Sequence, residues 1–85
     1  MPPEQPTQLV REWLTTDLHG LNTLTICQRQ GLGVSQIAAR LRATVNDLVE
    51  EAVLPADLNV AQVNWTGLAE DTPRLIVAAV RHFGF

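Results

Sequence analysis

The spacing of the apolar residues is the strongest constraint on the fold, because they recur every three to four positions through most of the chain. That period is typical of amphipathic α-helices. The clearest helix lies near the C-terminal end, where Thr72 is a capping residue, Pro73 suits the first helical position and Gly84 follows the last apolar residue. The other helical segments are residues 7–18, 22–30, 35–42, 44–54 and, fitting an extended stretch equally well, 57–65. The sequence therefore predicts an all-α fold, a compact bundle of about six short helices.

Residues that begin or end helices set the predicted boundaries. Gly20 and Gly31 are expected to end the first two helices, because glycine readily adopts the left-handed conformation of a C-terminal cap. Ser35 is expected to cap the third helix and Thr44 the fourth. Pro55 would end the fourth helix, because proline cannot continue one. A very short turn would then join the third helix to the fourth.

Length and composition describe one small globular domain. The 85 residues include 46% hydrophobic and 18% charged side chains, with a net charge of −3 and a pI of about 5.1. Such a chain has no general attraction to phosphate backbones or anionic lipid. Cys27 is the sole cysteine, so no internal disulfide can form and a cytoplasmic location is expected. Residues 1–6 are predicted to be a flexible leader and residues 7–85 the folded domain, with no apolar run long enough for a membrane span.

No group of residues in the sequence indicates catalysis, a metal site or a cofactor. Ser35 is the only serine and is better explained as a helix cap than as a nucleophile. Cys27 lies on an apolar helical stripe, which favours a buried small hydrophobic residue over a reactive thiolate. His19 and His82 lie far apart in the sequence and make no recognisable metal-binding set. We therefore expect a protein without enzymatic activity.

Residues 34–54 resemble a helix-turn-helix. Ala38 follows the apolar Ile37 and Leu41 precedes the predicted turn, although Arg42 stands where the turn usually has glycine. Two packed amphipathic helices in any helical bundle would give the same pattern. The pattern therefore supports two helices joined by a short turn but does not by itself indicate DNA binding. It leaves a small DNA-binding transcriptional regulator as one candidate function.

The charges on this pair favour a protein partner over DNA. The outward face of the fourth predicted helix carries Asn46, Asp47, Glu50 and Glu51. Its three carboxylates would face the phosphates in a major groove, and only Asn46 is of a residue type that commonly reads bases. The preceding segment is basic, with the arginines Arg29, Arg40 and Arg42. Adjacent basic and acidic surfaces can bind a copy of the same domain, so these seven residues are the predicted contacts of an adaptor-type interaction domain.

Two other functions stay open at this point. In a DNA-binding regulator, the arginines would contact the phosphate backbone from the flank of the acidic helix. In an inhibitor or mimic, the acidic helix would occupy the basic groove of another protein, one to one. The adaptor interpretation differs from both, because a head-to-tail contact between identical copies produces rings or open filaments.

The last third of the chain resembles the C-terminal end of bacterial effector-associated domains, which are death-like adaptor modules. The likeness lies in Val63-Asn64-Trp65-Thr66-Gly67, Thr72-Pro73, Leu75-Ile76, Ala79-Val80 and Gly84. In that family an apolar-Asn-apolar-Ser/Thr-Gly turn precedes a last helix that ends near a glycine. This sequence departs from the family early in the last helix, where Leu75 or Ile76 stands in place of the usual aromatic residue. The resemblance implies a death-fold-like six-helix bundle, homotypic binding in signalling or defence, and contact with a downstream effector.

Overall fold

The computed structural model describes residues 5–85, and these residues fold into helices without any strand. The elements are α1 (Gln5–Thr16), α2 (Leu18–Arg29), α3 (Val34–Glu50), the 3₁₀ turn η1 (Val60–Gln62), α4 (Trp65–Glu70) and α5 (Thr72–Phe83). The predicted all-α fold class is confirmed. Of the predicted leader, residues 1–4 lie outside the described part of the chain, whereas Gln5 and Pro6 already belong to α1.

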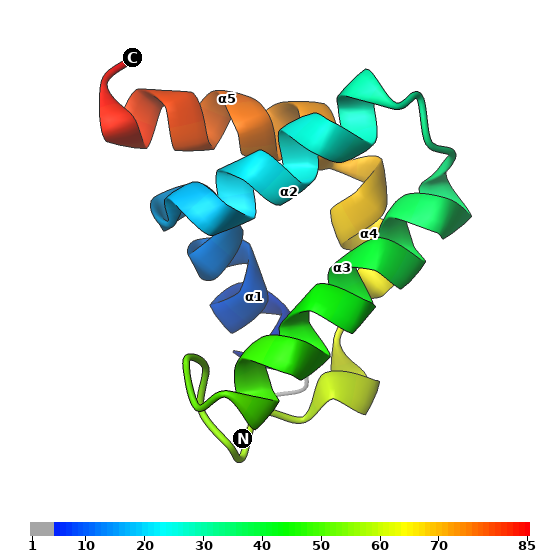
Figure 1. Cartoon of the computed structure of the whole chain (residues 1–85), viewed down its shortest axis with the longest axis vertical. Coiled ribbons are helices and arrows are strands. Elements are labelled where there is room, and N and C mark those ends of the chain that lie inside the picture. The colour runs from blue at the N-terminus through cyan, green and yellow to red at the C-terminus, as the bar shows by residue number, and fades with distance from the viewer. Residues whose placement is uncertain (1–4) are drawn as a thin grey trace.

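The helices form two groups that share one core (Figure 1). In one group α1, α2 and α5 pack against each other, and in the other α3 packs on α4 and η1. The largest side chains that solvent does not reach are Val10, Leu14, Leu24, Cys27, Leu41, Val45 and Leu68. They come from both groups and belong to one continuous hydrophobic cluster, so burial of these side chains holds the two groups together.

Two polar contacts tie α1 to the C-terminal third of the chain. Nη1 of Arg11 donates to Oδ2 of Asp71 over 3.2 Å, in an ion pair that is partly exposed on both sides. The backbone N–H of Asn64 donates to Oγ1 of Thr7 over 2.9 Å. Because α1 also packs along α5, the first and last helices of the described chain are neighbours.

Helix α5 matches its prediction closely. It runs from Thr72 to Phe83, has Pro73 in its first turn and ends at Gly84, whose φ of 76° is left-handed. Asp71 occupies the N-cap position instead of Thr72, and Thr72 is buried with its hydroxyl donating to the carbonyl of Ala69 over 2.7 Å. The predicted boundaries are therefore right to within one residue.

The sequence predicted that Gly20 ends the first helix, and this prediction is wrong. Helix α1 ends at Thr16, and Asp17 caps α2 by accepting a hydrogen bond from the backbone N–H of His19 over 2.8 Å. Gly20 lies inside α2 against α1, where a Cβ atom would be 2.8 Å from the Cα of Leu14. This glycine is needed for the close approach of two helices. Gly31, by contrast, is left-handed just beyond the end of α2, with a φ of 65°, as predicted.

The predicted turn between Arg42 and Thr44 is absent, because α3 is one continuous helix of 17 residues. Its buried side chains form a single stripe at successive turns: Ile37, Leu41, Val45 and Leu48. The hydroxyl of Thr44 donates to the carbonyl of Arg40 over 2.9 Å and so bonds within the helix instead of capping a new one. Gly33, and not Ser35, occupies the N-cap of α3. Residues 34–54 are therefore not a helix-turn-helix pair.

The chain between α3 and α5 is mostly loop, where the sequence left helix and extended structure open. Residues 57–65 contain only the short turn η1 and the first residue of α4. Trp65 is buried, and its indole N–H donates to the carbonyl of Val60 over 3.1 Å. Asn64 caps α4 by accepting from the backbone N–H of Gly67 over 3.0 Å. The short helix α4 is the element that the sequence did not predict.

Candidate interaction surface

All seven predicted contact residues are exposed. Five lie within α3, Glu51 is the C-terminal cap residue of α3, and Arg29 lies in the last turn of α2. Because residues four positions apart share a helix face, Arg42, Asn46 and Glu50 form one row along α3. Arg40, Asp47 and Glu51 form a second row beside it. Both rows change from basic to acidic toward the C-terminal end of the helix.

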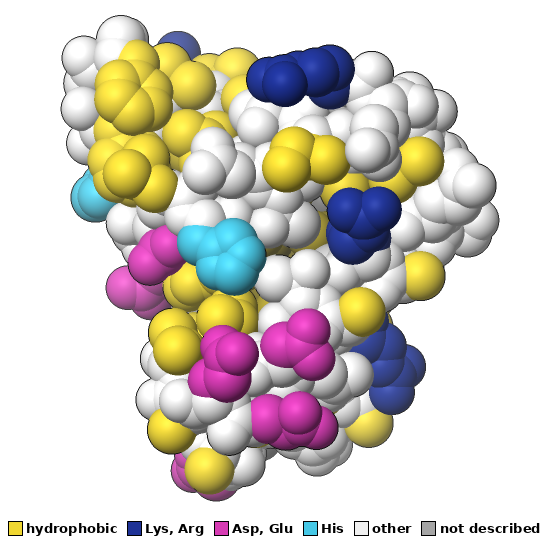
Figure 2. Space-filling model, in the orientation of Figure 1, with side chains coloured by type: hydrophobic (Ala, Val, Ile, Leu, Met, Phe, Trp, Pro, Cys, Tyr) yellow, Lys and Arg dark blue, Asp and Glu magenta, His cyan; other side chains and the backbone are white. Residues whose placement is uncertain are grey.

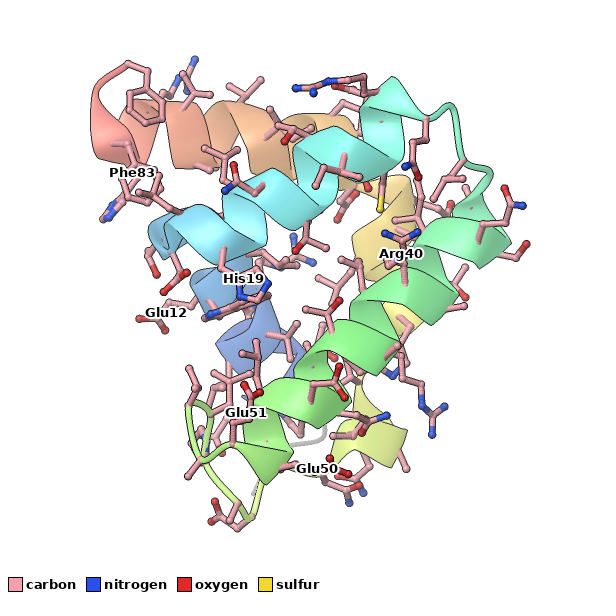
Figure 3. All side chains as sticks on the ribbon, viewed as in Figure 1. Glu12, His19, Arg40, Glu50, Glu51 and Phe83 are labelled. Atoms are coloured by element: carbon pink, nitrogen blue, oxygen red, sulfur yellow. The ribbon has the colours of Figure 1, made fainter. Side chains whose placement is uncertain are left out.

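The basic residues are not all in one place. Arg40 lies in the angle between α2 and α3 (Figure 3), on the side of α3 that faces the end of α2. There its charge partly opposes the effect of burial, which raises the pKa of the Cys27 thiol. Arg42 points to the other edge of the exposed face, because two helix positions correspond to a rotation of about 200°. Arg29 lies at the end of α2, Arg40 lies within α3 on the side that faces α2, and Arg42 lies apart from both.

The acidic residues are gathered at the C-terminal end of α3. Figure 2 shows acidic side chains clustered over this end of the helix, with basic side chains farther up the same face and at its right edge beside the acidic cluster. A helix carries partial negative charge at its C-terminus, and α3 has no basic residue in its last turn. Asp47 also lies three and four positions before Glu50 and Glu51, a spacing at which like charges repel. The acidic end is therefore electrostatically unfavourable within a single molecule.

No ion pair within residues 5–85 involves these carboxylates. Among residues 5–85 the one ion pair is that of Arg11 with Asp71, which includes none of the seven contact residues. Along the helix axis Arg40 lies about 10 Å from Asp47 and about 16 Å from Glu51. Those separations exceed the Debye length of about 8 Å at physiological ionic strength, whereas Arg42 lies about 7.5 Å from Asp47 along the axis, so the basic residues neutralise the acidic end only in part.

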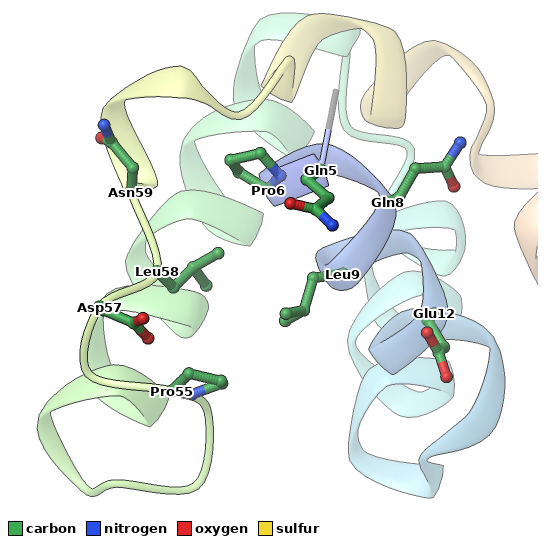
Figure 4. A pocket seen from close by; sticks show the side chains of 9 residues that line it. All are labelled: Gln5, Pro6, Gln8, Leu9, Glu12, Pro55, Asp57, Leu58 and Asn59. Carbon is green, nitrogen blue, oxygen red and sulfur yellow. The ribbon is translucent and has the colours of Figure 1, made fainter. Parts of the chain in front are cut away.

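A groove of about 430 Å³ lies between α1 and the loop that follows α3 (Figure 4). Leu9 and Leu58 face each other across it, and the apolar lining continues with Pro6 and Pro55. The carboxylate of Glu12 lies on the α1 side and that of Asp57 on the loop side, both exposed. Three amide side chains complete the lining, those of Gln5, Gln8 and Asn59. The sequence did not reveal this groove, because nothing in residues 55–59 indicates which helix they lie beside.

The residues considered for chemistry lie apart from each other. Cys27 is buried, whereas Ser35, His19 and His82 are exposed. His19 lies edge-on to Trp13, with 5.6 Å between ring centroids, and His82 lies edge-on to Phe83 at 5.0 Å. Within residues 5–85, no three His, Cys, Asp or Glu side chains are grouped so that they could hold a metal ion. None of the helices in this part of the chain has the length and apolar character to cross a bilayer.

Comparison of the chain with protein-family models, curated proteins and solved structures finds no match. A proposal about function therefore depends on the residues and their geometry. The features with a clear physical meaning are the two charge rows of α3, the cluster of acidic residues at the C-terminal end of that helix, and the groove beside it.

Proposed function

We propose that this chain is a protein–protein interaction domain that binds copies of itself head to tail. The acidic end of α3 in one copy contacts the basic surface of the next, formed by Arg29 and Arg40 with Arg42 at its edge. The observation that carries the proposal is the unbroken helix α3, which exposes basic side chains in its middle and acidic ones at its end, none of them in an ion pair within residues 5–85. Asn46 lies among the acidic residues and adds hydrogen-bonding capacity to that contact.

Charge complementarity supports this pairing on energetic grounds. An arginine from a neighbouring copy would relieve the repulsion among Asp47, Glu50 and Glu51 and would also interact favourably with the C-terminal helix dipole. Exposed charges of this kind set the orientation and the rate of association more than the affinity. Because the two contact surfaces are different, each copy keeps one surface free after binding, and assembly continues into an open chain or closes into a ring.

The alternative of a DNA-binding regulator has less support than the adaptor proposal. It rested on a bihelical pair at residues 34–54, and α3 is continuous through the predicted turn. The exposed face of α3 would also bring three carboxylates toward the phosphates of a bound duplex. The resemblance to bacterial effector-associated domains supports the adaptor proposal instead. It adds a further kind of partner, either a related helical domain or a downstream effector in cytoplasmic signalling or defence.

Light scattering on a sizing column, over a range of protein and salt concentrations, tests the proposal. The wild-type protein should grow into larger species as its concentration rises, and salt should dissolve them. The acid-reversed variant Glu50→Arg/Glu51→Arg should remain monomeric with unchanged helicity by circular dichroism. A base-reversed variant, Arg29→Glu/Arg40→Glu, should also remain monomeric.

An equal mixture of these two variants gives the sharpest result. Each keeps one native surface, and the reversed surface of one is complementary in charge to the reversed surface of the other, so the mixture should assemble into larger species again although neither variant does so alone. The matched control for the base-reversed variant is Arg74→Glu/Arg81→Glu, which makes the same charge change at exposed positions on α5 and should assemble like the wild type. A wild-type protein that stays monomeric at every concentration would contradict self-association, and normal assembly of the acid-reversed variant would exclude the end of α3 as a contact. A salt-resistant dimer that is retained by DNA would favour the regulator.

A further inference from the structure

The groove between α1 and the loop after α3 has an aliphatic interior between two carboxylates. Leu9 and Leu58 face each other across it, and both pack against the hydrophobic core, which holds them in place. The carboxylate of Glu12 lies on the α1 wall and that of Asp57 on the loop wall, and both are exposed. No basic residue lines the groove, and the one ion pair within residues 5–85 involves neither carboxylate. A complementary ligand is therefore aliphatic at its centre and positively charged on both sides.

The size of the groove matches a short extended segment of chain. An extended chain takes up roughly 160 Å³ per residue, from a rise of about 3.3 Å and spacings of about 4.8 and 10 Å to its neighbours. The groove volume of about 430 Å³ therefore holds about two to three extended residues. One turn of an α-helix alone takes up roughly 400–600 Å³. A helix of several turns can therefore only lie across the rim of the groove.

A chain in the polyproline II conformation presents the required groups to both walls. This conformation has three residues per turn, so successive side chains point about 120° apart. When the middle side chain of a tripeptide enters between Leu9 and Leu58, its two neighbours point toward the walls that carry Glu12 and Asp57. Such a backbone makes no internal hydrogen bonds and needs other partners. The three amide side chains of the lining can supply them, because a primary amide both donates and accepts.

A second copy of this chain does not offer a segment of that kind. All six of its basic residues are arginines, and each lies within a helix of at least 12 residues. A helix of that length has more than three turns, so it cannot enter the groove. The folded chain therefore has no extended, positively charged segment to insert into the groove of a neighbour, and the complementary segment belongs to a different protein.

We infer that the groove binds an extended peptide segment of a different protein, in which one aliphatic residue stands between two arginines or lysines. The aliphatic side chain packs between Leu9 and Leu58, and the two basic side chains pair with Glu12 and Asp57. The site uses none of the α3 contact residues, so it goes beyond the proposed self-association and does not depend on it. An assembly of copies presents one groove per copy, and a partner with several such segments binds it more tightly than it binds a single copy.

Fluorescence anisotropy with synthetic pentapeptides tests the inference. The probe is Gly-Arg-Leu-Arg-Gly with a neutral dye at its N-terminus and an amide at its C-terminus, titrated with the wild-type protein at low salt. Replacing the leucine of the probe by serine should weaken binding about tenfold, because burial of the aliphatic side chain is lost. Replacing both arginines of the probe by glutamine should weaken binding several-fold, because both charge pairs are lost.

Variants of the groove carboxylates give the matching result from the protein side. Glu12→Gln/Asp57→Asn should weaken binding of the arginine probe several-fold. The matched control is Glu50→Gln/Glu51→Gln, which removes two exposed carboxylates outside the groove and should bind the probe as the wild type does. The charge-swapped protein Glu12→Arg/Asp57→Arg should prefer Gly-Glu-Leu-Glu-Gly over the arginine probe, and circular dichroism checks that it is folded.

The outcomes separate this inference from the proposed function. A leucine probe that binds no more tightly than the serine probe, or a folded charge-swapped protein that still prefers arginine, overturns the inference while self-association stands. Loss of self-association in the Glu12→Gln/Asp57→Asn protein would assign the groove to a second copy and overturn it as well. A wild-type protein that stays monomeric but binds the probes in the expected order overturns the proposed function alone.

Discussion

Removing charge from the C-terminal end of α3 is expected to stabilise the isolated fold. Glu50 and Glu51 lie at the negative pole of the helix, and both repel Asp47. Each exposed carboxylate at such a pole costs about 0.3 kcal/mol, and each like-charge pair about 0.2–0.5 kcal/mol. The variant Glu50→Gln/Glu51→Gln removes two carboxylates from the negative end of the helix and two like-charge pairs, those of Asp47 with Glu50 and with Glu51. Its free energy of unfolding should therefore exceed that of the wild type by about 1–1.5 kcal/mol.

Urea denaturation followed by circular dichroism measures this difference. The protein concentration must be low enough to keep the wild type monomeric, because binding between folded copies would itself stabilise the wild type. In thermal unfolding a gain of about 1 kcal/mol corresponds to a rise in Tm of about 4–8 °C for a domain of this size. The control Glu12→Gln removes a carboxylate one turn before the end of α1 and should change stability far less.

Salt provides the decisive comparison for the electrostatic explanation. At about 1 M salt the Debye length falls to about 3 Å, so most of the gain should disappear. A variant no more stable than the wild type at low salt would show that the acidic end carries no strain, and the energetic support for the proposed contact would be lost. A more stable variant that has lost self-association would show that these carboxylates serve binding at the expense of stability.

Three further predictions follow from individual contacts. Gly20→Ala should destabilise the fold by about 1–3 kcal/mol in urea denaturation, because its Cβ would lie 2.8 Å from the Cα of Leu14 and helix backbones cannot yield as a side chain can. Burial raises the pKa of the Cys27 thiol above its ordinary value of 9.0, so the unfolded thiol ionises first and stability should fall as the pH rises above that value. Cys27→Ala should abolish that fall. Trp65→Phe removes the indole N–H bonded to the carbonyl of Val60 and should lower stability by about 1–3 kcal/mol.

Matched measurements test each of these reasons. Gly33→Ala is the control for the first, since its Cβ would meet no atom closer than 3.9 Å and Gly33 has an ordinary negative φ. Equal effects of the two alanine substitutions would exclude close helix packing as the reason for Gly20. Stability that falls equally with pH in the Cys27→Ala protein would assign the dependence to other groups. A tryptophan variant of wild-type stability would mean that the hydrogen bond of Trp65 contributes nothing measurable.

Local signals predicted the helices where each signal had one physical meaning. Pro73 and Gly84 mark the two ends of α5 correctly, because proline in the first turn and a left-handed glycine have few other uses in a helical chain. Gly20 and Thr44 each had two uses. A glycine also permits close packing of helices, and a threonine hydroxyl also bonds to the carbonyl four residues back, and the folded chain uses these second roles. The continuous apolar stripe from Ile37 to Leu48 was the signal that outweighed the cap at Thr44.

The surface was predictable where it depends on one helix and not where it depends on two. The exposure of Asp47, Glu50 and Glu51 follows from helical periodicity alone and is confirmed. The pairing of Arg29 with Arg40 depends on the angle between α2 and α3, which no local pattern encodes. The groove likewise depends on packing between α1 and a loop more than forty residues later, so sequence periodicity held no information about it.

Because α1 lies against α5, the order in which a ribosome releases the chain matters for this domain. Val10 and Leu14 leave the ribosome well before Leu75 and Ala79, which are buried residues of α5. Long-range contacts of this kind cannot form until the whole domain has emerged. A nascent chain interrupted before α5 would present uncovered apolar residues of α1 to chaperones and proteases. The part of the core between α1 and α5 can therefore form only after α5 has emerged.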